Sequence, residues 1–274
     1  MGLNGKRLLA FATVLAVVGF LIFRACGPLQ GASVVVWTGL VAALVGAVCV
    51  VKPVRFLGIG ERRVGAVILL GGAAAVAAAL LWPSPAIRIP RRQTSIDEFV
   101  PEYHFNERHA VLVHVPPERV TAVWKKVTLG ELGYTEQLLR LRAIASGRFR
   151  SRPRSSNRLL SGAGRLGIRL REGEREIVAG MVGTPWSATP GPLLKTPEEF
   201  VQFRAPGSVK IAYDMRVEDA GNGWSRLTSE TRVVATDDSA RRIMACYWRV
   251  IYPGSSIIRR WWLEAIQRRA EASS

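Results

Sequence analysis

The sequence predicts an α+β protein in two parts: about three apolar helices, then a domain with an antiparallel sheet and a long C-terminal helix. Three observations predict it. Of the 274 residues 49% are hydrophobic, and residues 8–82 carry only six charged side chains. Alternating patterns over residues 208–217 and 225–236 are typical of two paired strands. Apolar residues at helical spacing follow from residue 240 to the end of the chain.

The first part, residues 1–82, contains three runs without a charged side chain, at residues 8–23, 32–51 and 64–82. As helices that rise about 1.5 Å per residue they would measure roughly 24, 30 and 28 Å, close to the hydrocarbon thickness of a bilayer. We therefore expect three transmembrane helices that anchor the protein, with the lipid bilayer as a partner. A signal peptide is the alternative for the first run because Lys6 and Arg7 precede it, although no small-residue cleavage pattern follows.

Small residues mark one face of the third run. Gly71, Ala75 and Ala79 recur every four residues, which favours close packing of that face against another helix. An alanine-rich span without such a contact is the alternative. None of the three runs contains a carboxylate, histidine or lysine, so they are interpreted as an anchor and not as an ion pathway.

Basic residues beside the three runs suggest an orientation. Six flank one side and four the other, which favours a cytoplasmic N-terminus and an extracytoplasmic C-terminal domain. Only six of the 38 basic residues are lysines, a bias typical of GC-rich bacterial genomes. We expect a multi-pass protein of the bacterial cell membrane, with a linker rich in proline and arginine at residues 83–95 that is stiff and holds the domain near the bilayer.

The net charge of +17 is unevenly distributed. Residues 1–95 carry +9, residues 140–171 contain ten arginines and no acidic residue, and the remainder of the second part sums to −2. The positive charge thus lies beside the apolar runs and in one local patch, and it does not extend over the second part. This distribution argues against a nucleic-acid partner. The patch is suited to anionic lipid headgroups, with a solvated loop as the alternative; its candidate residues are Arg148, Arg150, Arg152, Arg154 and Arg158.

The second part, residues 96–274, is long enough for one hydrophobic core. Periodicity and turn residues predict strands over residues 109–115, 167–170 and 176–182 and helices over residues 118–127 and 134–144. The firmest local prediction is a hairpin of residues 208–217 and 225–236, turning at Gly221, Asn222 and Gly223.

The predicted hairpin has one buried and one wet face. On the buried face lie Val209, Ile211, Tyr213, Met215 and Val217; Asp214 and Glu230 lie on the wet face. Arg216 and Arg232 lie beside them, so ion pairing between strands explains these carboxylates better than acid–base catalysis does. A final amphipathic helix begins at Asp237 or Asp238, is interrupted at Pro253 and Gly254, and resumes from Ser255.

Three segments of the second part carry a family resemblance: HAVLVHVPPERVTAV from His109, SVKIAYDMRVEDAGNGWSRLTSETRV from Ser208, and YWRVIYPGSSIIRRWWLEAIQRRAE from Tyr247. In these segments the chain resembles the SRPBCC superfamily, also called START-like or polyketide cyclase-like. The resemblance implies a helix-grip fold, in which a curved antiparallel sheet wraps around the C-terminal helix. It also implies a cavity between sheet and helix that takes a lipid, a polyketide or another apolar ligand.

Four side chains on the inward faces are candidates to line such a cavity: Tyr213, Met215, Met244 and Tyr247. Methionine adapts to irregular ligands. The alternative is that these side chains fill a core. We therefore expect a membrane-anchored module that binds an apolar or amphipathic small molecule. The alternatives are a cyclase or dehydratase that uses the same cavity, and a protein-interaction domain with a filled core. Polar residues at the cavity floor would favour the enzyme.

No motif of nucleophilic, phosphate-binding or dinucleotide-binding chemistry is present, and we expect no catalytic residue and no cofactor. His104, His109 and His114 are spaced by five, so on an extended chain they alternate in direction and form no metal site. Cys26, Cys49 and Cys246 are too far apart for a thiolate site. The ligand, any protein partner and the oligomeric state are not specified by the sequence.

Overall fold

The computed structural model describes residues 30–54, 59–132, 137, 139–140, 167–187 and 189–272. The chain divides into two compact units: residues Met1–Ser84 with Ala245–Tyr252, and residues Pro85–Met244 with Pro253–Ser274. The expected first apolar helix, most of the helix expected at residues 134–144, and the five arginines from Arg148 to Arg158 lie outside the described residues.

Two helices of the first unit are long and apolar enough to cross a membrane. They are Gln30–Val51, with 22 residues and a mean hydropathy of 2.6, and α2 (Arg62–Leu81), with 20 residues and 2.4. The described ranges contain these two, where the sequence predicted three. Their large apolar side chains are mostly exposed; Leu44, Val67 and Leu70 are 66 to 70% exposed.

The two helices touch through glycine. A Cβ on Gly72 would lie 2.6 Å from Ala43 N and from Gly39 O, so only glycine allows this backbone approach. The buried residues of α2 are Gly65, Gly72 and Ala79. The predicted stripe of every fourth residue was wrong, because Gly71 faces open space. The buried residues Gly65, Gly72 and Ala79 are instead spaced by seven, the spacing that keeps residues at the contact line between two helices.

The end of α2 is held within the same unit by Arg249, which is 1% exposed. Its guanidinium donates to Leu80 O at 2.6 Å, to Trp82 O at 2.5 Å and to Ser84 Oγ at 3.1 Å. Carbonyls at the C-terminus of a helix have no partner within the helix, and a cation there satisfies them.

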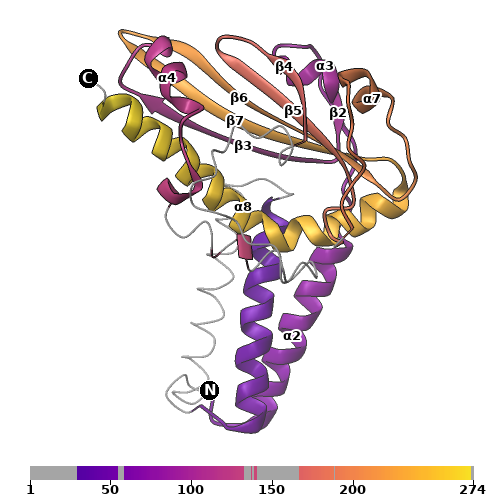
Figure 1. Ribbon diagram of the computed structural model, residues 1–274. Helices are drawn as coiled ribbons and strands as arrows, with labels where there is room; N and C mark the ends of the chain where they lie inside the picture. The colour runs from indigo at the N-terminus through magenta and orange to yellow at the C-terminus, as the bar shows by residue number, and fades with distance from the viewer. Residues whose placement is uncertain are drawn as a thin grey trace. The chain divides into compact units, whose positions relative to one another are not determined.

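The second unit has an antiparallel sheet of five strands in the order β3-β7-β6-β5-β4 (Figure 1). The strands are β3 (Phe105–Val113), β4 (Ile168–Glu172), β5 (Glu176–Gly183), β6 (Val209–Gly221) and β7 (Trp224–Ala235). A separate pair joins β1 (Ile87–Arg88) and β2 (Glu102–Tyr103). The helices are α3 (Ile96–Phe99), α4 (Pro117–Trp124), η2 (Leu129–Glu131), α7 (Pro197–Gln202) and α8 (Asp238–Ala272). The predicted α+β class, with an antiparallel sheet and a long C-terminal helix, is confirmed.

The predicted hairpin is confirmed as β6 and β7. Tyr213 pairs with Thr231 and Met215 with Ser229. The chain turns through Gly221, Asn222 and Gly223 with φ of 80°, 52° and 76°, the left-handed conformations that glycine and asparagine adopt most readily.

The predicted interruption of the last helix was wrong. α8 continues through Pro253 as one helix of 35 residues (Figure 1). Proline removes the hydrogen bond that its own nitrogen would donate. A long helix tolerates this loss when tertiary contacts hold its flanking turns, as the contacts of Arg249 and Ser255 do here.

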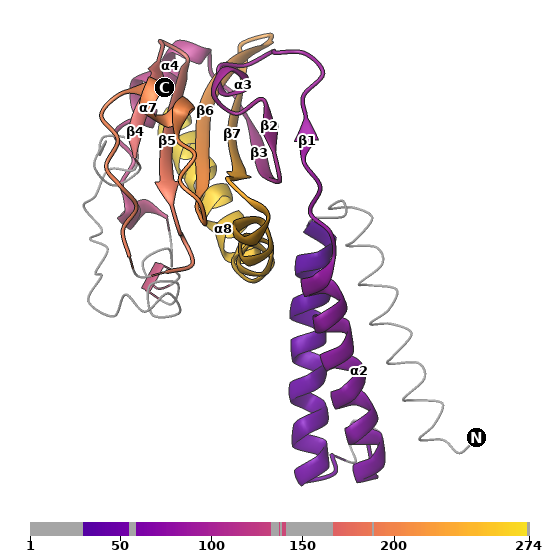
Figure 2. The same cartoon turned by 90° about the vertical axis from the view of Figure 1, so that its right-hand side faces the viewer.

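Each face of the sheet has a buried core. We call the face toward α8 the inner face; its core includes Met215, Leu227, Trp262 and Ile266. The opposite, outer face has a second core around Phe200 in α7 and Ile96 in α3, together with Val178 and Ala212 of the sheet. α3 contacts β6, and α7 contacts β4 and β5 (Figure 2). The predicted wet face was therefore wrong, because two short helices absent from the sequence prediction cover it.

Candidate functional site

Two of the four residues predicted to line a cavity fill the inner core. Tyr213 and Met215 are 6% and 0% exposed and belong to one apolar cluster with side chains of α8. Met244 is buried and Tyr247 is half-buried, in the N-terminal half of α8. Within the described ranges, neither hollow reported below is lined by any of the four. Their assignment to a ligand cavity stays a prediction.

A polar cluster lies on the inner face beside this core. Glu107 of β3 is 1% exposed. Its Oε1 lies 2.9 Å from His109 Nε2, and its Oε2 accepts a hydrogen bond from Ser255 Oγ of α8 at 2.7 Å. Both carboxylate oxygens therefore have partners within the protein. The arrangement ties α8 to β3.

Arg259 makes a second tie between α8 and the inner face. Its guanidinium donates to Thr231 Oγ1 at 2.9 Å and to Ser229 Oγ at 3.4 Å. It also lies 5.5 Å from the ring centroids of Tyr213 and Trp262, within the range of cation–π attraction. Burial raises the pKa of Tyr213 to about 12, although the charge of Arg259 opposes the rise. Tyr213 is thus neutral at pH 7 and serves as packing.

The outer face carries a network of five buried charges: Asp97, Asp214, Arg216, Glu230 and Arg232. Arg232 bonds Asp97 Oδ1 at 2.6 Å and Glu230 Oε1 at 2.7 Å. Arg216 bonds Asp214, whose other oxygen accepts from Glu230 N at 2.9 Å. The predicted ion pairing of Asp214 and Glu230 is confirmed, but the pairs are buried and not wet.

Three carboxylates face two guanidinium groups in this network, so one negative charge is left uncompensated. Burial raises the pKa of Asp214 to about 7, while Arg216 opposes and Glu230 adds to the rise. A single proton on Asp214 would balance the network.

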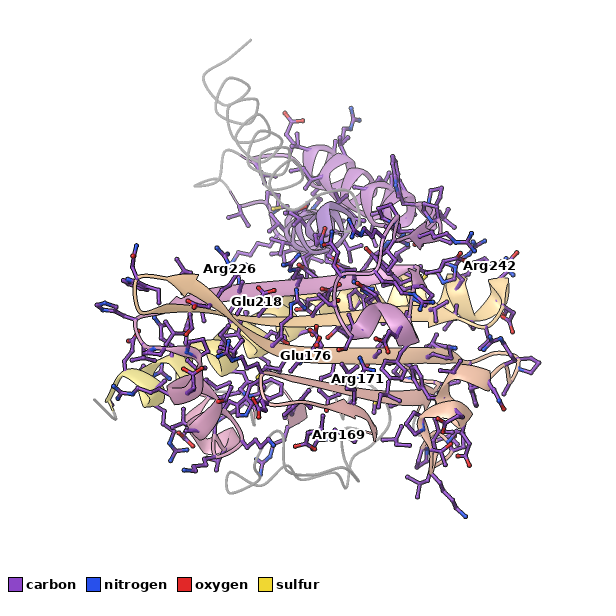
Figure 3. The ribbon with its side chains drawn as sticks, turned by 90° about the horizontal axis from the view of Figure 1, so that it is seen from above. Arg169, Arg171, Glu176, Glu218, Arg226 and Arg242 are labelled. Atoms are coloured by element: carbon purple, nitrogen blue, oxygen red, sulfur yellow. The ribbon has the colours of Figure 1, made fainter. Side chains whose placement is uncertain are left out.

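Further polar contacts hold the segment around α3 over the outer face. Asp97 Oδ2 accepts from Gln93 N at 2.6 Å and from Thr94 N at 2.8 Å. Ser95 Oγ donates to Glu176 at 2.6 Å, and Arg171 bonds Glu98 at 2.8 Å; Figure 3 labels Glu176 and Arg171 on β5 and β4. These contacts fix the backbone that continues into Phe99 and Val100.

That backbone forms one wall of a hollow of about 280 Å³, which we call the outer hollow. Its other walls come from the segment after α7 and from β6 and β7. The apolar lining includes Phe99, Phe203 and Val234, and the charged residues on its lining are Glu102, Arg204 and Lys210. Another hollow, of about 350 Å³, lies against Glu131, Ala265, Arg268 and Arg269.

Lys210 is the buried charge of the outer hollow. Lys210 is 8% exposed. Its Nζ donates to Val201 O at 3.0 Å and lies 5.4 Å from the centroid of the Phe200 ring. Among the described residues no carboxylate lies within ion-pair distance of Nζ. Burial lowers the pKa of Lys210 to about 8, and the nearby charge of Arg204 adds to the effect.

Glu102 and Arg204, the other charges on the lining, have their own partners. Glu102 pairs with Arg88 at 3.2 Å. Arg204 NH1 donates to the carbonyls of Val201 and Phe203, each at 2.7 Å. Lys210 differs from both in its burial, and the structure gives an acceptor to one of the three donors of its ammonium group.

The alternating pattern placed Lys210 on the predicted wet face, so the sequence did not mark it as a site residue. A signal for α7 was present: Thr196 is followed by Pro197 and two glutamates, and Thr196 Oγ1 accepts from Glu199 N at 3.3 Å. This is a helix start, and it would have predicted a cover over the outer face near Lys210.

The three histidines serve the structure separately. His104 Nδ1 accepts from Ala235 N at 3.0 Å, His109 contacts Glu107, and His114 stacks on Trp224 at 4.2 Å. Burial and Arg241 lower the pKa of His104. Within the part of the chain that the structure describes, no three His, Cys, Asp or Glu side chains group as metal ligands.

No protein-family model, curated protein or solved structure matches the chain. The resemblance to the SRPBCC superfamily therefore rests on the sequence segments themselves. The functional argument rests on the geometry of the two faces.

Proposed function

We propose that this protein is a membrane-anchored binding module for an amphipathic small molecule, and that the molecule binds in the outer hollow. The observation that carries the proposal is Lys210, a buried ammonium without a carboxylate partner among the described residues, in a hollow with aromatic walls. Ligand sites commonly combine a mostly apolar lining with a few polar groups. Buried charges without a partner are costly, and a ligand can supply the missing partner.

The anchor is the helix pair Gln30–Val51 and α2. At about 1.5 Å per residue their lengths correspond to roughly 33 and 30 Å, enough to cross the hydrocarbon core. Their exposed surfaces are apolar and their contact is made through small residues, as is common between helices in lipid. Multiple membrane passes, the side on which the domain lies and a bacterial source are part of the proposal.

The helix-grip assignment is also part of the proposal. It is supported by the order of the elements, with α8 along the inner face of an antiparallel sheet. On that face the side chains of Glu107 and Arg259 bond to the protein itself. We therefore propose binding at the outer hollow in place of catalysis beneath the sheet.

Native mass spectrometry of the full chain, purified from its own membranes in mild detergent, tests the binding. We expect an additional small-molecule mass on the protein. Val234→Phe, which extends a side chain into the outer hollow, should remove that mass. Leu112→Phe on the exposed part of β3 is the matched control and should retain it. A protein without any bound mass, or a bound mass indifferent to Val234→Phe, would refute the proposed site.

Extraction at alkaline pH tests the anchor. We expect the wild-type protein to stay in the membrane pellet. Leu44→Arg together with Leu70→Arg should release a measurable fraction, because each arginine costs about 2.5–3.5 kcal/mol at the centre of a membrane helix. Release of the wild-type chain by alkali would contradict an integral anchor.

A further inference from the structure

We infer that the outer hollow is a monocarboxylate site, in which the carboxylate of a compact apolar acid pairs with Lys210. The inference rests on the proposed function and narrows its ligand class.

Charge is the first step. Lys210 is nine-tenths buried, and one of its three donors is used by Val201 O at 3.0 Å. The guanidinium of Arg204 lies close enough to disfavour the protonated lysine, and burial does so more strongly. An anion in the hollow would reverse both effects, since an opposite charge within about 4–6 Å favours the charged form of lysine.

The number of donors then limits the anion. Sites for phosphate groups use several backbone N–H groups or an arginine fork. In the outer hollow NH1 of Arg204 donates to the carbonyls of Val201 and Phe203, and Glu102, which pairs with Arg88, also lies on the lining. Two free donors of one ammonium match the two oxygens of a carboxylate.

Volume and lining describe the rest of the ligand. The outer hollow of about 280 Å³ lies just below the range of about 300–1,000 Å³ that is typical of ligand sites. Phe99, Phe203 and Val234 offer apolar surface to the remainder of the molecule. A ligand with one ring or a short branched chain fits this volume.

Phenylacetate is a suitable probe, and phenylacetamide is its neutral isostere. Binding to the full chain in nanodiscs of uncharged lipid can be measured by ligand-observed NMR, with empty nanodiscs as a blank. We expect phenylacetate to bind at least about tenfold more tightly than phenylacetamide, the effect of one hydrogen-bonded charge. Lys210→Met should abolish this preference, and Lys210→Arg should retain part of it. Lys126→Met, at an exposed lysine, should leave it unchanged.

Lys210→Met keeps the aliphatic stem and removes a buried charge, so the variant is expected to fold; the far-ultraviolet circular dichroism of the protein checks this. Equal binding of phenylacetate and phenylacetamide to the wild-type protein would overturn the monocarboxylate inference, as would a preference that survives Lys210→Met. A failure of phenylacetate to bind would also overturn it. In each case a co-purifying mass that Val234→Phe removes would leave the proposed function standing.

Discussion

Both faces of the sheet bury polar strand residues, but the partners of these residues differ between the two faces. On the inner face the charges of Glu107 and Arg259 are matched by hydroxyls, rings or a histidine, and they lie beside an apolar core. On the outer face five charges form one network, and beside it a lysine remains without a carboxylate next to a hollow. The difference indicates that the charges of the inner face serve stability. On the outer face, the ammonium of Lys210 has no carboxylate partner among the described residues. Four stability measurements on the full chain in detergent test this contrast.

The largest effect is expected for Arg232→Met. It leaves Asp97 and Glu230 buried without the guanidinium that bonds both. Removing one partner of a buried ion pair costs about 3–5 kcal/mol. Chemical denaturation followed by circular dichroism of the strands measures the change. If the free energy of unfolding falls by less than about 1 kcal/mol, water reaches the network and the outer face is not shielded from solvent.

Met215→Ala probes the apolar part of the inner face. Met215 is fully buried in the core with α8, and truncation of a buried methionine costs about 2–5 kcal/mol, with a cavity left behind. Denaturation under the same conditions gives the value. If stability is unchanged and the variant gains affinity for an apolar probe such as benzene, the inner face already holds usable space, as the helix-grip resemblance implies.

The charge network also predicts a dependence on pH. The pKa of Asp214 rises from 3.8 to about 7 on folding. The folded state thus holds this proton more tightly than the unfolded state does. The stabilisation is complete below pH 3.8 and is lost as pH rises through about 7. Between about pH 5 and pH 7 the free energy of unfolding should fall by about 2 kcal/mol from this group. Asp214→Asn should flatten this part of the profile; an equal slope in the variant would assign it to other groups.

The smallest effect is expected for Ser255→Ala on the inner face. It removes the hydroxyl that donates to Glu107 Oε2 at 2.7 Å while His109 still contacts Oε1. The expected cost is about 1–3 kcal/mol, since the carboxylate loses one of two partners. The same denaturation assay measures it. A cost larger than that of Arg232→Met would reverse the ranking of the two faces.

Local pattern alone was enough for the hairpin of β6 and β7, because alternation and glycine turns act between neighbouring residues. The same pattern also placed Asp214 and Glu230 beside Arg216 and Arg232, so their pairing could be predicted. It could not predict burial of these pairs. Whether a strand face is wet depends on what covers it, and the covers are α3 and α7, of four and six residues. Helices this short carry little periodic signal.

The candidate site was beyond prediction for a related reason. Lys210 stands at an ordinary alternating position in β6, and nothing beside it in the chain marks it as special. Its ammonium group lies against Val201 O and the Phe200 ring of α7, and the hollow that it lines also needs Phe99 and Val234 from two other segments. By itself the sequence determined two apolar helices, the pairing of β6 with β7 and the amphipathic character of α8, since each follows from periodicity within one segment or two neighbouring ones. The tertiary structure alone decided which charged side chains of the sheet are buried. The loss of water around a charge depends on every segment packed against it, and these segments are distant in the sequence.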